Sequence, residues 1–509
     1  MVNNLTLEEA IEATFHRFPR NESYVVPGFY DINSADATFA IAMCLMIFQM
    51  QTGFALVEAG IVRSKNSINI MMKNIADVCI GGLAWWVFGF GLAFGRGFWS
   101  TPFFGAGDFF VDMKFGDALA APVITLFFYQ MSYATTSNTI VSGAIAERAS
   151  FPAYCLLTFI MTLPYSIGAG WVWGEHGFLR NLGVVDLSGG VIHIVGGAAG
   201  VACAWFIGPR IGRYDKGKET LPMGNPMNAC VGMFILWWGW LAFNAGCAYG
   251  ITGGKWAYAA RGGCGTALAT WGAGAFSIIY SMVRNKGRVD IYEVVTGILC
   301  ALIMINSSCF LMPNFICVIT GAMAAFFSIT MIPWMDKIGI DDPIGVYCIH
   351  WFGGIWGYLT VGLFAEDPVP LSTTSGRSGL IMGGGFWLFS IQCIAIVSLT
   401  LLGFFGGLLI MWICNKIMPI RLDPESEEKG CDLVEHGVYD VNNSYAPYPP
   451  PSIDDMKPSN VKFDNVARLS IPNNYDSFVS NSGSFRMRSN FVFDRSDSVR
   501  SSPKLTPRV

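Results

Sequence analysis

Charged residues are scarce in this chain of 509 amino acids. Asp, Glu, Lys and Arg make up 13% of the residues, whereas hydrophobic residues make up 53%. A soluble domain carries about 25% charged residues, so the composition excludes an ordinary soluble protein. The mean hydropathy is +0.45. The net charge of −4 reflects acidic loops and tails, and we expect no nucleic-acid partner.

Paired cysteine motifs are absent as well. None of the 14 cysteines belongs to a Cys-x-x-Cys pair, and most of them, including Cys44, Cys203 and Cys300, lie inside apolar stretches. A zinc site or a disulfide framework is therefore disfavoured, because both need characteristic cysteine spacings. We expect free thiols that pack as small hydrophobic side chains, and we predict no metal and no cofactor.

Apolar windows of about 20 residues, enough to cross a hydrocarbon core of about 30 Å, recur along most of the chain. They predict an all-α polytopic membrane protein with eleven transmembrane helices, surrounded by membrane lipids. The predicted spans are 36–60, 71–95, 118–146, 151–173, 186–208, 226–249, 262–283, 290–311, 312–334, 344–364 and 385–415.

The two ends of the chain lack such windows. We predict an extracellular N-terminal segment 1–35, a membrane domain 36–415, a cytosolic segment 416–437 and a disordered cytosolic tail 438–509. The tail is rich in Ser, Asn and Asp and cannot bury enough apolar surface to fold alone. The first segment lacks the pattern of a cleavable signal peptide. Its two glycosylation sequons, at Asn4 and Asn21, predict a glycoprotein with these residues outside the cytosol.

The distribution of basic residues agrees with this orientation. With the N-terminus outside and an odd number of spans, the inward loops are richer in Lys and Arg than the outward loops, as the positive-inside rule requires. We therefore predict an integral protein of the plasma membrane with its C-terminus in the cytosol. The inward basic residues are Arg63, Lys65, Arg148, Arg210, Arg213, Lys216, Lys218, Arg284, Lys286 and Arg288.

Only two of the five histidines, His193 and His350, lie deep in apolar stretches, and each opens the phrase His-x-x-Gly-Gly. A titratable ring inside a membrane is costly and commonly marks a functional pathway. If five spans end with the His193 span and five more end with the His350 span, the two halves have opposite orientations. This pattern predicts an inverted five-plus-five helix repeat with a site near the bilayer midplane.

An acidic residue precedes each of these histidines. Asp186 lies seven residues before His193, and Asp342 lies eight residues before His350. Such an acid can cap the start of a helix and interact with the positive end of its dipole, or it can contact a substrate. Capping is the interpretation that we favour.

Two facing neutral imidazoles can share one hydrogen bond and still offer a nitrogen to a passing molecule. They suit a small neutral molecule or a relay of protons. The alternative is a pair of core histidines bonded to each other or to carbonyl groups. Four aromatic residues within the predicted spans could attract a small cation through their ring faces, although each taken singly is more often a core residue. They are Tyr133, Trp173, Trp240 and Phe243.

Several long motifs occur in order between about residue 36 and residue 437. They are MQTGFALVEAGIVRSKN from Met50 to Asn66, Gln130 to Tyr133, IVSGAIAER from Ile140 to Arg148, Trp171 to Trp173, Asp186 to His193, GWLAFNAG from Gly239 to Gly246, Asp341 to His350 and Gly430 to Gly437. Together these motifs resemble the ammonium transporter family, in its Amt/Mep branch.

The resemblance implies a homotrimer with one narrow pore in each subunit, no enzymatic activity, and ammonium or ammonia as the substrate, with methylammonium as an analogue. In the family, an outer vestibule recruits ammonium through a tryptophan, a phenylalanine and a hydroxyl group. Trp173 and Phe243 match the two aromatic residues, and Cys247 occupies the hydroxyl position. The family's two stacked gate phenylalanines correspond to Tyr133 and Phe243.

Deeper in the implied pore, His193 and His350 match the family's twin histidines, and Asp186 matches the acid that organises the cation site. Trp240 is a further pore residue in this interpretation. We expect ammonium to bind at the outer aromatic rings and to lose its proton near Asp186, because charge is costly in so apolar a pore. Ammonia would pass the imidazoles, and the proton would either return outside or move through the histidines.

The chain departs from the family pattern at four points. A thiol at Cys247 is a weak acceptor and should weaken cation recruitment, whereas the Tyr133 hydroxyl could partly replace it. The interval from Asp186 to His193 is one residue shorter than usual, equivalent to about 100° of helix rotation. Trp351 is bulkier than the family norm. We expect these changes to affect rate and selectivity more than fold.

Two other functional classes remain open in the sequence. The same scaffold could act as an ammonium sensor or transceptor with little flux. A membrane haem protein with histidine ligands is the other class, but the small residues around His193 and His350 leave little room for a macrocycle. The segment from Arg421 to Gly437 resembles the family's regulatory tail, which contacts a neighbouring subunit.

Overall fold

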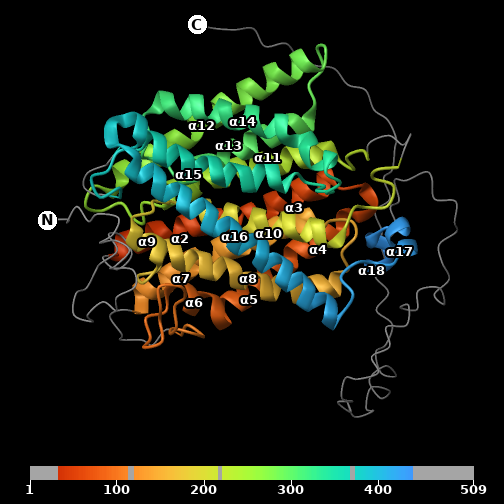
Figure 1. The fold of residues 1–509 in the computed structure, drawn as a ribbon, viewed down its shortest axis with the longest axis horizontal. Helices are drawn as coiled ribbons and strands as arrows, with labels where there is room; N and C mark the ends of the chain where they lie inside the picture. The colour runs from red at the N-terminus through yellow and green to blue at the C-terminus, as the bar shows by residue number, and fades with distance from the viewer. Residues whose placement is uncertain (1–31, 113–119, 216–220, 367–372, 439–509) are drawn as a thin grey trace, which may run out of the picture. The chain divides into compact units, whose positions relative to one another are not determined.

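The structure is a computed structural model that describes residues 32–112, 120–215, 221–366 and 373–438 (Figure 1). In these residues the chain is helical, and the only β-structure is three isolated bridges. The prediction of an all-α chain is therefore confirmed for the described part. The sequons at Asn4 and Asn21 and the tail beyond Val438 lie outside the described residues.

Every predicted apolar window contains helix. The α-helices are α2 (Ser34–Phe48), α3 (Met50–Ile61), α4 (Ser67–Ala76), α5 (Gly82–Ala84), α6 (Phe90–Phe94), α7 (Ala120–Ala144), α8 (Phe151–Trp173), α9 (Phe178–Leu182), α10 (Gly190–Ile207), α11 (Pro226–Gly246), α12 (Lys255–Arg284), α13 (Ile291–Asn306), α14 (Asn314–Lys337), α15 (Phe352–Phe364), α16 (Phe386–Ile417), α17 (Pro424–Lys429) and α18 (Cys431–His436). Short π-helical segments interrupt this series: η2 (Asp77–Gly81), η3 (Trp85–Gly89), η4 (Tyr347–Trp351) and η5 (Leu380–Gly384).

Within the described residues, eight helical stretches are long and apolar enough to cross a membrane. Of the helices outside this group, α13 has 16 residues, α15 has 13 residues after the π-helical segment η4, and α7 has 25 residues. The eight stretches are Ser34–Ile61, Ser64–Phe94, Phe151–Leu182, Gly190–Ile207, Pro226–Gly246, Lys255–Arg284, Asn314–Lys337 and Phe386–Ile417.

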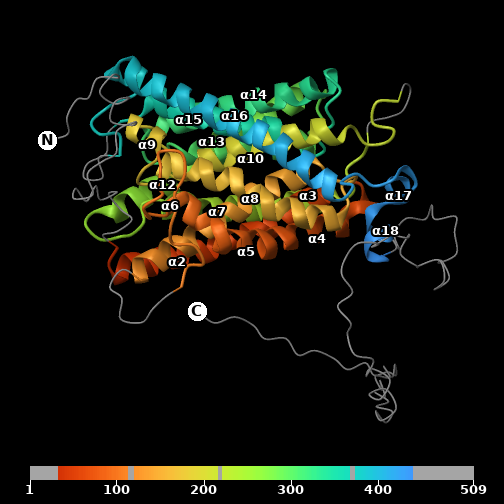
Figure 2. The same cartoon turned by 60° about the horizontal axis from the view of Figure 1, so that its bottom comes forward.

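Helix α10 lies in the middle of the helical region (Figures 1 and 2). It contacts α7, α8, α15 and α16. Of its apolar window, 89% is buried, compared with 28% for α16. The many Gly and Ala residues of α10 explain this position, because small side chains let several helices approach one backbone.

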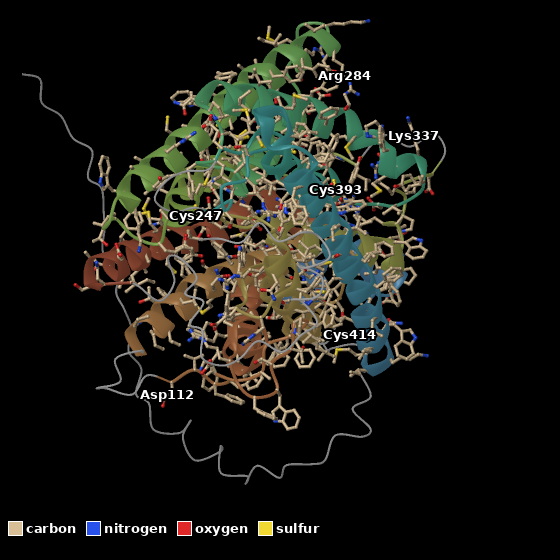
Figure 3. All side chains as sticks on the ribbon, turned by 60° about the vertical axis from the view of Figure 1, so that its left-hand side comes forward. Asp112, Cys247, Arg284, Lys337, Cys393 and Cys414 are labelled. Carbon is tan, nitrogen blue, oxygen red and sulfur yellow. The ribbon has the colours of Figure 1, made fainter. Side chains whose placement is uncertain are left out.

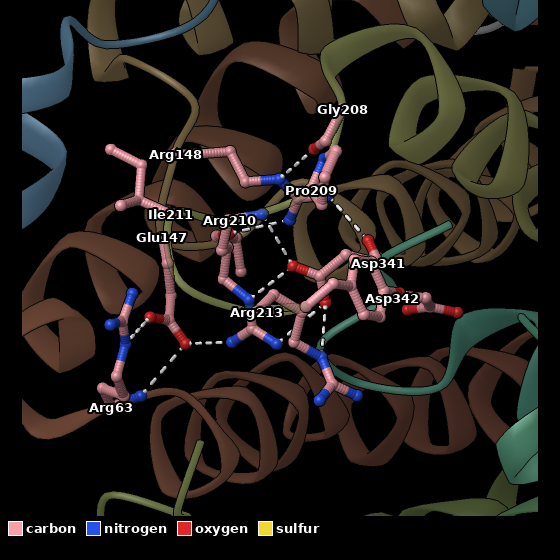
Figure 4. A network of polar contacts seen from close by, with 12 residues as sticks. Arg63, Glu147, Arg148, Gly208, Pro209, Arg210, Ile211, Arg213, Asp341 and Asp342 are labelled. Carbon is pink, nitrogen blue, oxygen red and sulfur yellow. Dashed lines mark hydrogen bonds and ion pairs between the residues drawn. The ribbon is translucent and has the colours of Figure 1, made fainter. Parts of the chain in front are cut away.

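The charged side chains at the ends of α10 and α7 form a buried network (Figure 4). Arg210 donates to Asp341 at 2.7 and 2.9 Å and pairs with Glu147, which also pairs with Arg63. Arg148 donates to three backbone carbonyls, those of Ala146, Gly208 and Asp341. Several of the basic residues expected in inward loops therefore tie those loops together.

Burial alone would raise the pKa of Asp341, but the hydrogen bonds and the positive charge of Arg210 hold its pKa below the usual range. Glu147 behaves in the same way, because Arg210 and Arg63 more than offset its burial and lower its pKa. Both carboxylates are thus charged at neutral pH and locked to guanidinium groups.

Helix α18 packs beside α4 at this same end of the domain, and α17 packs against α18. The Asp432 carboxylate accepts hydrogen bonds from the backbone N–H groups of Ile68 and Asn69 at 3.0 and 2.7 Å. Glu435 accepts from the backbone N–H of Phe151 at 2.6 Å. Acidic side chains at the N-terminal turns of α4 and α8 match the helix dipoles there, so the segment docks on its own chain.

Candidate functional site

The two histidines that begin the His-x-x-Gly-Gly phrases lie side by side in the protein interior. His193 is on α10 and His350 is in η4; they are 0% and 5% exposed. Their Nδ1 atoms lie 3.1 Å apart, and the ring centroids are 5.2 Å apart at an interplanar angle of 27°. The two neutral rings therefore share one hydrogen bond.

The glycines of the two phrases bring these rings together. A Cβ atom on Gly197 would lie 2.5 Å from the backbone nitrogen of Trp351. In the second phrase, a Cβ atom on Gly354 would lie 3.0 Å from the backbone nitrogen of Ile194. Each phrase thus places its last glycine against the residue that follows the histidine of the other phrase, which is a reciprocal contact.

Both upstream acids cap the start of a histidine-bearing helix. Asp186 accepts hydrogen bonds from the backbone N–H groups of Gly189, Gly190 and Val191 at 2.9 to 3.1 Å. Asp342 accepts from those of Gly345 and Tyr347 at 3.0 and 2.9 Å. The geometry therefore matches the capping interpretation for both residues.

The second acid-to-histidine interval is one residue longer than the first, and η4 absorbs the difference. A π-helical turn closes its hydrogen bond over five residues instead of four, so it holds one more residue than an α-turn. His350 lies inside this turn and still meets His193. The short interval from Asp186 to His193 therefore does not move His193 out of reach.

Asp186 is engaged entirely within the protein. Besides its three backbone donors, its Oδ2 atom accepts from the Tyr358 hydroxyl at 3.1 Å. Its backbone carbonyl accepts from the Trp173 indole N–H at 2.9 Å. The carboxylate therefore fixes the start of α10, while its main chain positions Trp173.

A chain of aromatic rings leads from Trp173 to the histidines. Trp173 lies 5.9 Å from Tyr133 between ring centroids, and Tyr133 stacks on Phe243 at 4.5 Å and 18°. Phe243 lies 6.0 Å from Trp240. Trp240 in turn stacks on His193 at 5.8 Å and 26°, so the rings predicted separately from the sequence form one series.

Cys247 ends helix α11, one turn beyond Phe243 (labelled in Figure 3). Its thiol donates to the backbone carbonyl of Asn244 at 2.9 Å and lies 3.4 Å from the sulfur of Cys309. Cys247 is 7% exposed. The thiol is therefore mostly buried and already bonded.

Three polar residues beside the ring series or the histidine pair have no role in the sequence-based prediction. Asn306 contacts His193 through its side-chain amide, and Tyr129 accepts a hydrogen bond from the Tyr133 hydroxyl at 3.3 Å. Glu58 lines a small cavity together with His350, Phe54 and Trp240. A signal was available, because amide and carboxyl groups inside predicted spans are rare and costly.

Among the described residues, no group of three or more His, Cys, Asp or Glu side chains is arranged to hold a metal ion. Apart from Asn306 and Glu58, the side chains around the histidine pair are apolar or aromatic, among them Phe54 and Trp240.

A family model described as "Ammonium Transporter Family" matches residues 37–440. The chain belongs to the ammonium transporter family. As the resemblance of its motifs implies, the similarity extends over nearly the whole membrane domain, and with the long apolar helices it makes the chain an integral membrane protein.

Curated family members from distant organisms are similar to it. "Putative ammonium transporter 3" of Caenorhabditis elegans is 36% identical over 431 residues, which cover 83% of this chain and 62% of that protein. This chain thus spans less than two thirds of the length of that relative. "Ammonium transporter Amt2" of Archaeoglobus fulgidus is 33% identical over 427 residues, covering 79% of this chain and 87% of the relative.

Solved structures show the same fold. A protein described as "Sensor Amt Protein" superposes with a TM-score of 0.71 at 28% identity, covering 79% of this chain and 98% of that one. Mep2 of Candida albicans superposes with a TM-score of 0.70 at 24% identity, covering 77% and 87%. This helical architecture is therefore the family architecture.

Proposed function

We propose that this family member transports ammonium across a membrane through a narrow pore and that His193 and His350 form the centre of that pore. The observation that carries the proposal is the ring series from Trp173 to the histidine pair. The faces of its aromatic rings attract a cation, whereas the buried and mostly apolar path beyond them disfavours a charged species.

Each step of transport has a group suited to it. Ammonium binds at Trp173 and Phe243, because ring faces attract small cations by about 0.5–2 kcal/mol. The stacked rings of Tyr133 and Phe243 close the path below. Carrying charge past them is costly, so ammonium loses its proton near Asp186 and ammonia continues past the two imidazoles.

The proposal includes the family's membrane arrangement: eleven spans in an inverted five-plus-five repeat. The reciprocal contact of Gly197 with Trp351 and of Gly354 with Ile194 supports it, since elements related by a two-fold axis contact each other in this way. It further includes a homotrimer in the plasma membrane, a glycosylated extracellular N-terminus and a cytosolic C-terminus.

A sensor or transceptor with little flux is the second candidate. The similar solved structure described as "Sensor Amt Protein" favours it, as does the weak acceptor at Cys247. Uptake of labelled methylammonium in cells that lack their own ammonium transport separates the two functions, because a transporter accumulates the label and a sensor does not.

The same uptake assay tests the role of the histidine pair. His193→Ala should abolish uptake or alter it drastically, whereas His176→Ala, which changes a histidine outside the ring series, should leave it intact. Surface expression and thermal melting of both variants check that they fold. Unchanged uptake by folded His193→Ala would contradict the proposed pore centre.

A further inference from the structure

The side-chain amide of Asn306 connects Trp240 to His193. The Trp240 indole nitrogen lies 2.6 Å from Oδ1 of Asn306, and Nδ2 of Asn306 lies 3.0 Å from Nε2 of His193. All three residues are 0% exposed. This contact lies beside the pore centre but does not belong to the ring series or to the capping acids.

Donor chemistry fixes which way the amide faces. An indole N–H can only donate, so the Asn306 oxygen must face Trp240 and its NH₂ group must face His193. Because an NH₂ group can only donate, the Nε2 atom of His193 must be the unprotonated, accepting nitrogen. The proton of a neutral His193 is therefore on Nδ1.

The same logic passes through the histidine pair. At 3.1 Å from its partner, the Nδ1–H of His193 donates to Nδ1 of His350, which must then be unprotonated. The proton of neutral His350 is left on Nε2. His350 is buried as well, at 5% exposed against 0% for His193, and it lines the cavity beside Glu58 and Phe54.

We propose that Asn306, oriented by Trp240, is a positioning residue that fixes the tautomers of both histidines. It holds His193 with its proton on Nδ1 and His350 with its proton on Nε2. The N–H group offered to a molecule in the cavity then belongs to His350. Both ring nitrogens of His193 are already engaged, one by Asn306 and the other by His350.

This arrangement bears on the route of the proton during transport, a step that rests on the proposed function. A proton that arrived at Nε2 of His193 would face the two N–H donors of Asn306. The amide would have to turn, and the buried Trp240 N–H would lose its acceptor. Asn306 therefore opposes proton passage through His193 and favours return of the proton to the outer side.

Nitrogen-15 NMR of the full-length protein, with labelled histidine in lipid nanodiscs, tests the tautomers directly. Imidazole nitrogens with and without a proton have widely separated shifts, and His193→Gln and His350→Gln assign the signals. We expect protonated Nδ1 and bare Nε2 in His193, and the reverse in His350. The opposite pattern, or two rapidly exchanging tautomers, overturns the proposal.

Two substitutions test the part played by Asn306. Asn306→Leu and Trp240→Phe should each replace the fixed pattern with mixed tautomers, since the donor or its orientation is lost. Asn138→Leu is the matched control: Asn138 is also a buried amide in a membrane helix, bonded to Thr158 and Thr162, and it should leave the histidine signals unchanged. An unaltered pattern in folded Trp240→Phe and Asn306→Leu would exclude a positioning role.

The consequence for the proton is tested separately, by recording current and methylammonium uptake in the same cells. Asn306→Asp places carboxylate oxygen atoms against both Trp240 and His193. The variant side chain can therefore accept a hydrogen bond from Nε2 of His193 when that nitrogen carries a proton. It should raise the charge moved per methylammonium, whereas an unchanged ratio would contradict the opposing role. Absence of uptake in the unaltered protein would refute the transport function and leave the tautomer result standing.

Discussion

The Nδ1 atoms of His193 and His350 lie 3.1 Å apart, although 157 residues separate them in the chain. Each ring belongs to one copy of the same short phrase, and each phrase supplies the glycine that lets the other approach. The repetition in the sequence thus corresponds to a reciprocal contact in space.

Gly197→Ala should disrupt the histidine pair, because its Cβ atom would lie 2.5 Å from the backbone nitrogen of Trp351. Overpacking of this kind costs about 1–3 kcal/mol, and separating the backbones would also separate the rings. Thermal melting and methylammonium uptake measure both effects. Gly263→Ala is the control, since nothing lies within 4 Å of its Cβ position. Equal behaviour of the two variants would contradict the close approach.

Cys247→Ser should strengthen ammonium recruitment. The serine hydroxyl can keep the donation to Asn244 that the thiol makes at 2.9 Å, and its oxygen is a better acceptor than sulfur. A gained hydrogen bond of about 0.5–1.5 kcal/mol would lower the apparent KM for methylammonium by roughly 2- to 10-fold. Cys264→Ser, at an exposed thiol, serves as the comparison. A KM that does not fall would show that this position does not recruit the cation.

Asp341→Asn should destabilise the protein strongly. It removes one of the two carboxylates that pair with Arg210, whose side chain is 8% exposed, and leaves only Glu147. Breaking a buried ion pair costs about 3–5 kcal/mol. Asp336→Asn removes the more exposed partner of Arg213, and a surface pair contributes only about 0–1 kcal/mol. Melting temperatures in detergent should therefore fall much further for the first variant. Equal losses would mean that burial does not govern this network.

The effect of Asp341→Asn should also depend on pH. Since Arg210 keeps the pKa of Asp341 below its usual range, ionised Asp341 contributes its full stability above the unfolded pKa of about 3.9. That contribution is lost as the pH falls through the lower folded value. The difference in melting temperature between the parent and the variant should be nearly constant from pH 5 to 8, because even about one unit above 3.9 the group is mostly ionised, and it should shrink in stronger acid. A difference that grows on acidification would contradict the assignment.

Truncation after Asp440 should leave methylammonium uptake unchanged, because the docking contacts of Asp432 and Glu435 remain. Asp432→Ala in the full-length chain should release the segment, since the N–H groups of Ile68 and Asn69 lose their acceptor. Protease sensitivity of α17 and α18 reports the release, and uptake reports whether it affects the pore. Equal protease sensitivity of this variant and the parent would refute the docking role.

The sequence was a good guide to the helices. Apolar windows predicted helix in every place where the structure has a long one, and the repeated phrase singled out His193 and His350. The motif resemblance gathered Tyr133, Trp173 and Phe243 in one proposed pore, and these rings do lie in a series. These features follow from local composition and spacing, which a sequence displays directly.

Asn306 was missed for a physical reason. It lies 113 residues from His193, at the end of a mostly apolar helix, and its importance depends on which donors surround it. Likewise, the extra residue before His350 is accommodated by a π-helical turn that no local propensity predicts. Such features depend on packing between distant segments.

The amino-acid sequence by itself determined that this chain forms apolar helices, carries two buried histidines in repeated phrases and belongs with the ammonium transporters. Only the tertiary structure decided that the imidazoles meet through their Nδ1 atoms, that an amide between Trp240 and His193 orders their protons, and that Arg210 joins Asp341 and Glu147. The reason is that a hydrophobic pattern can be recognised within one short stretch of sequence. Hydrogen-bond direction and ion pairing depend instead on groups that come together only when the helices pack.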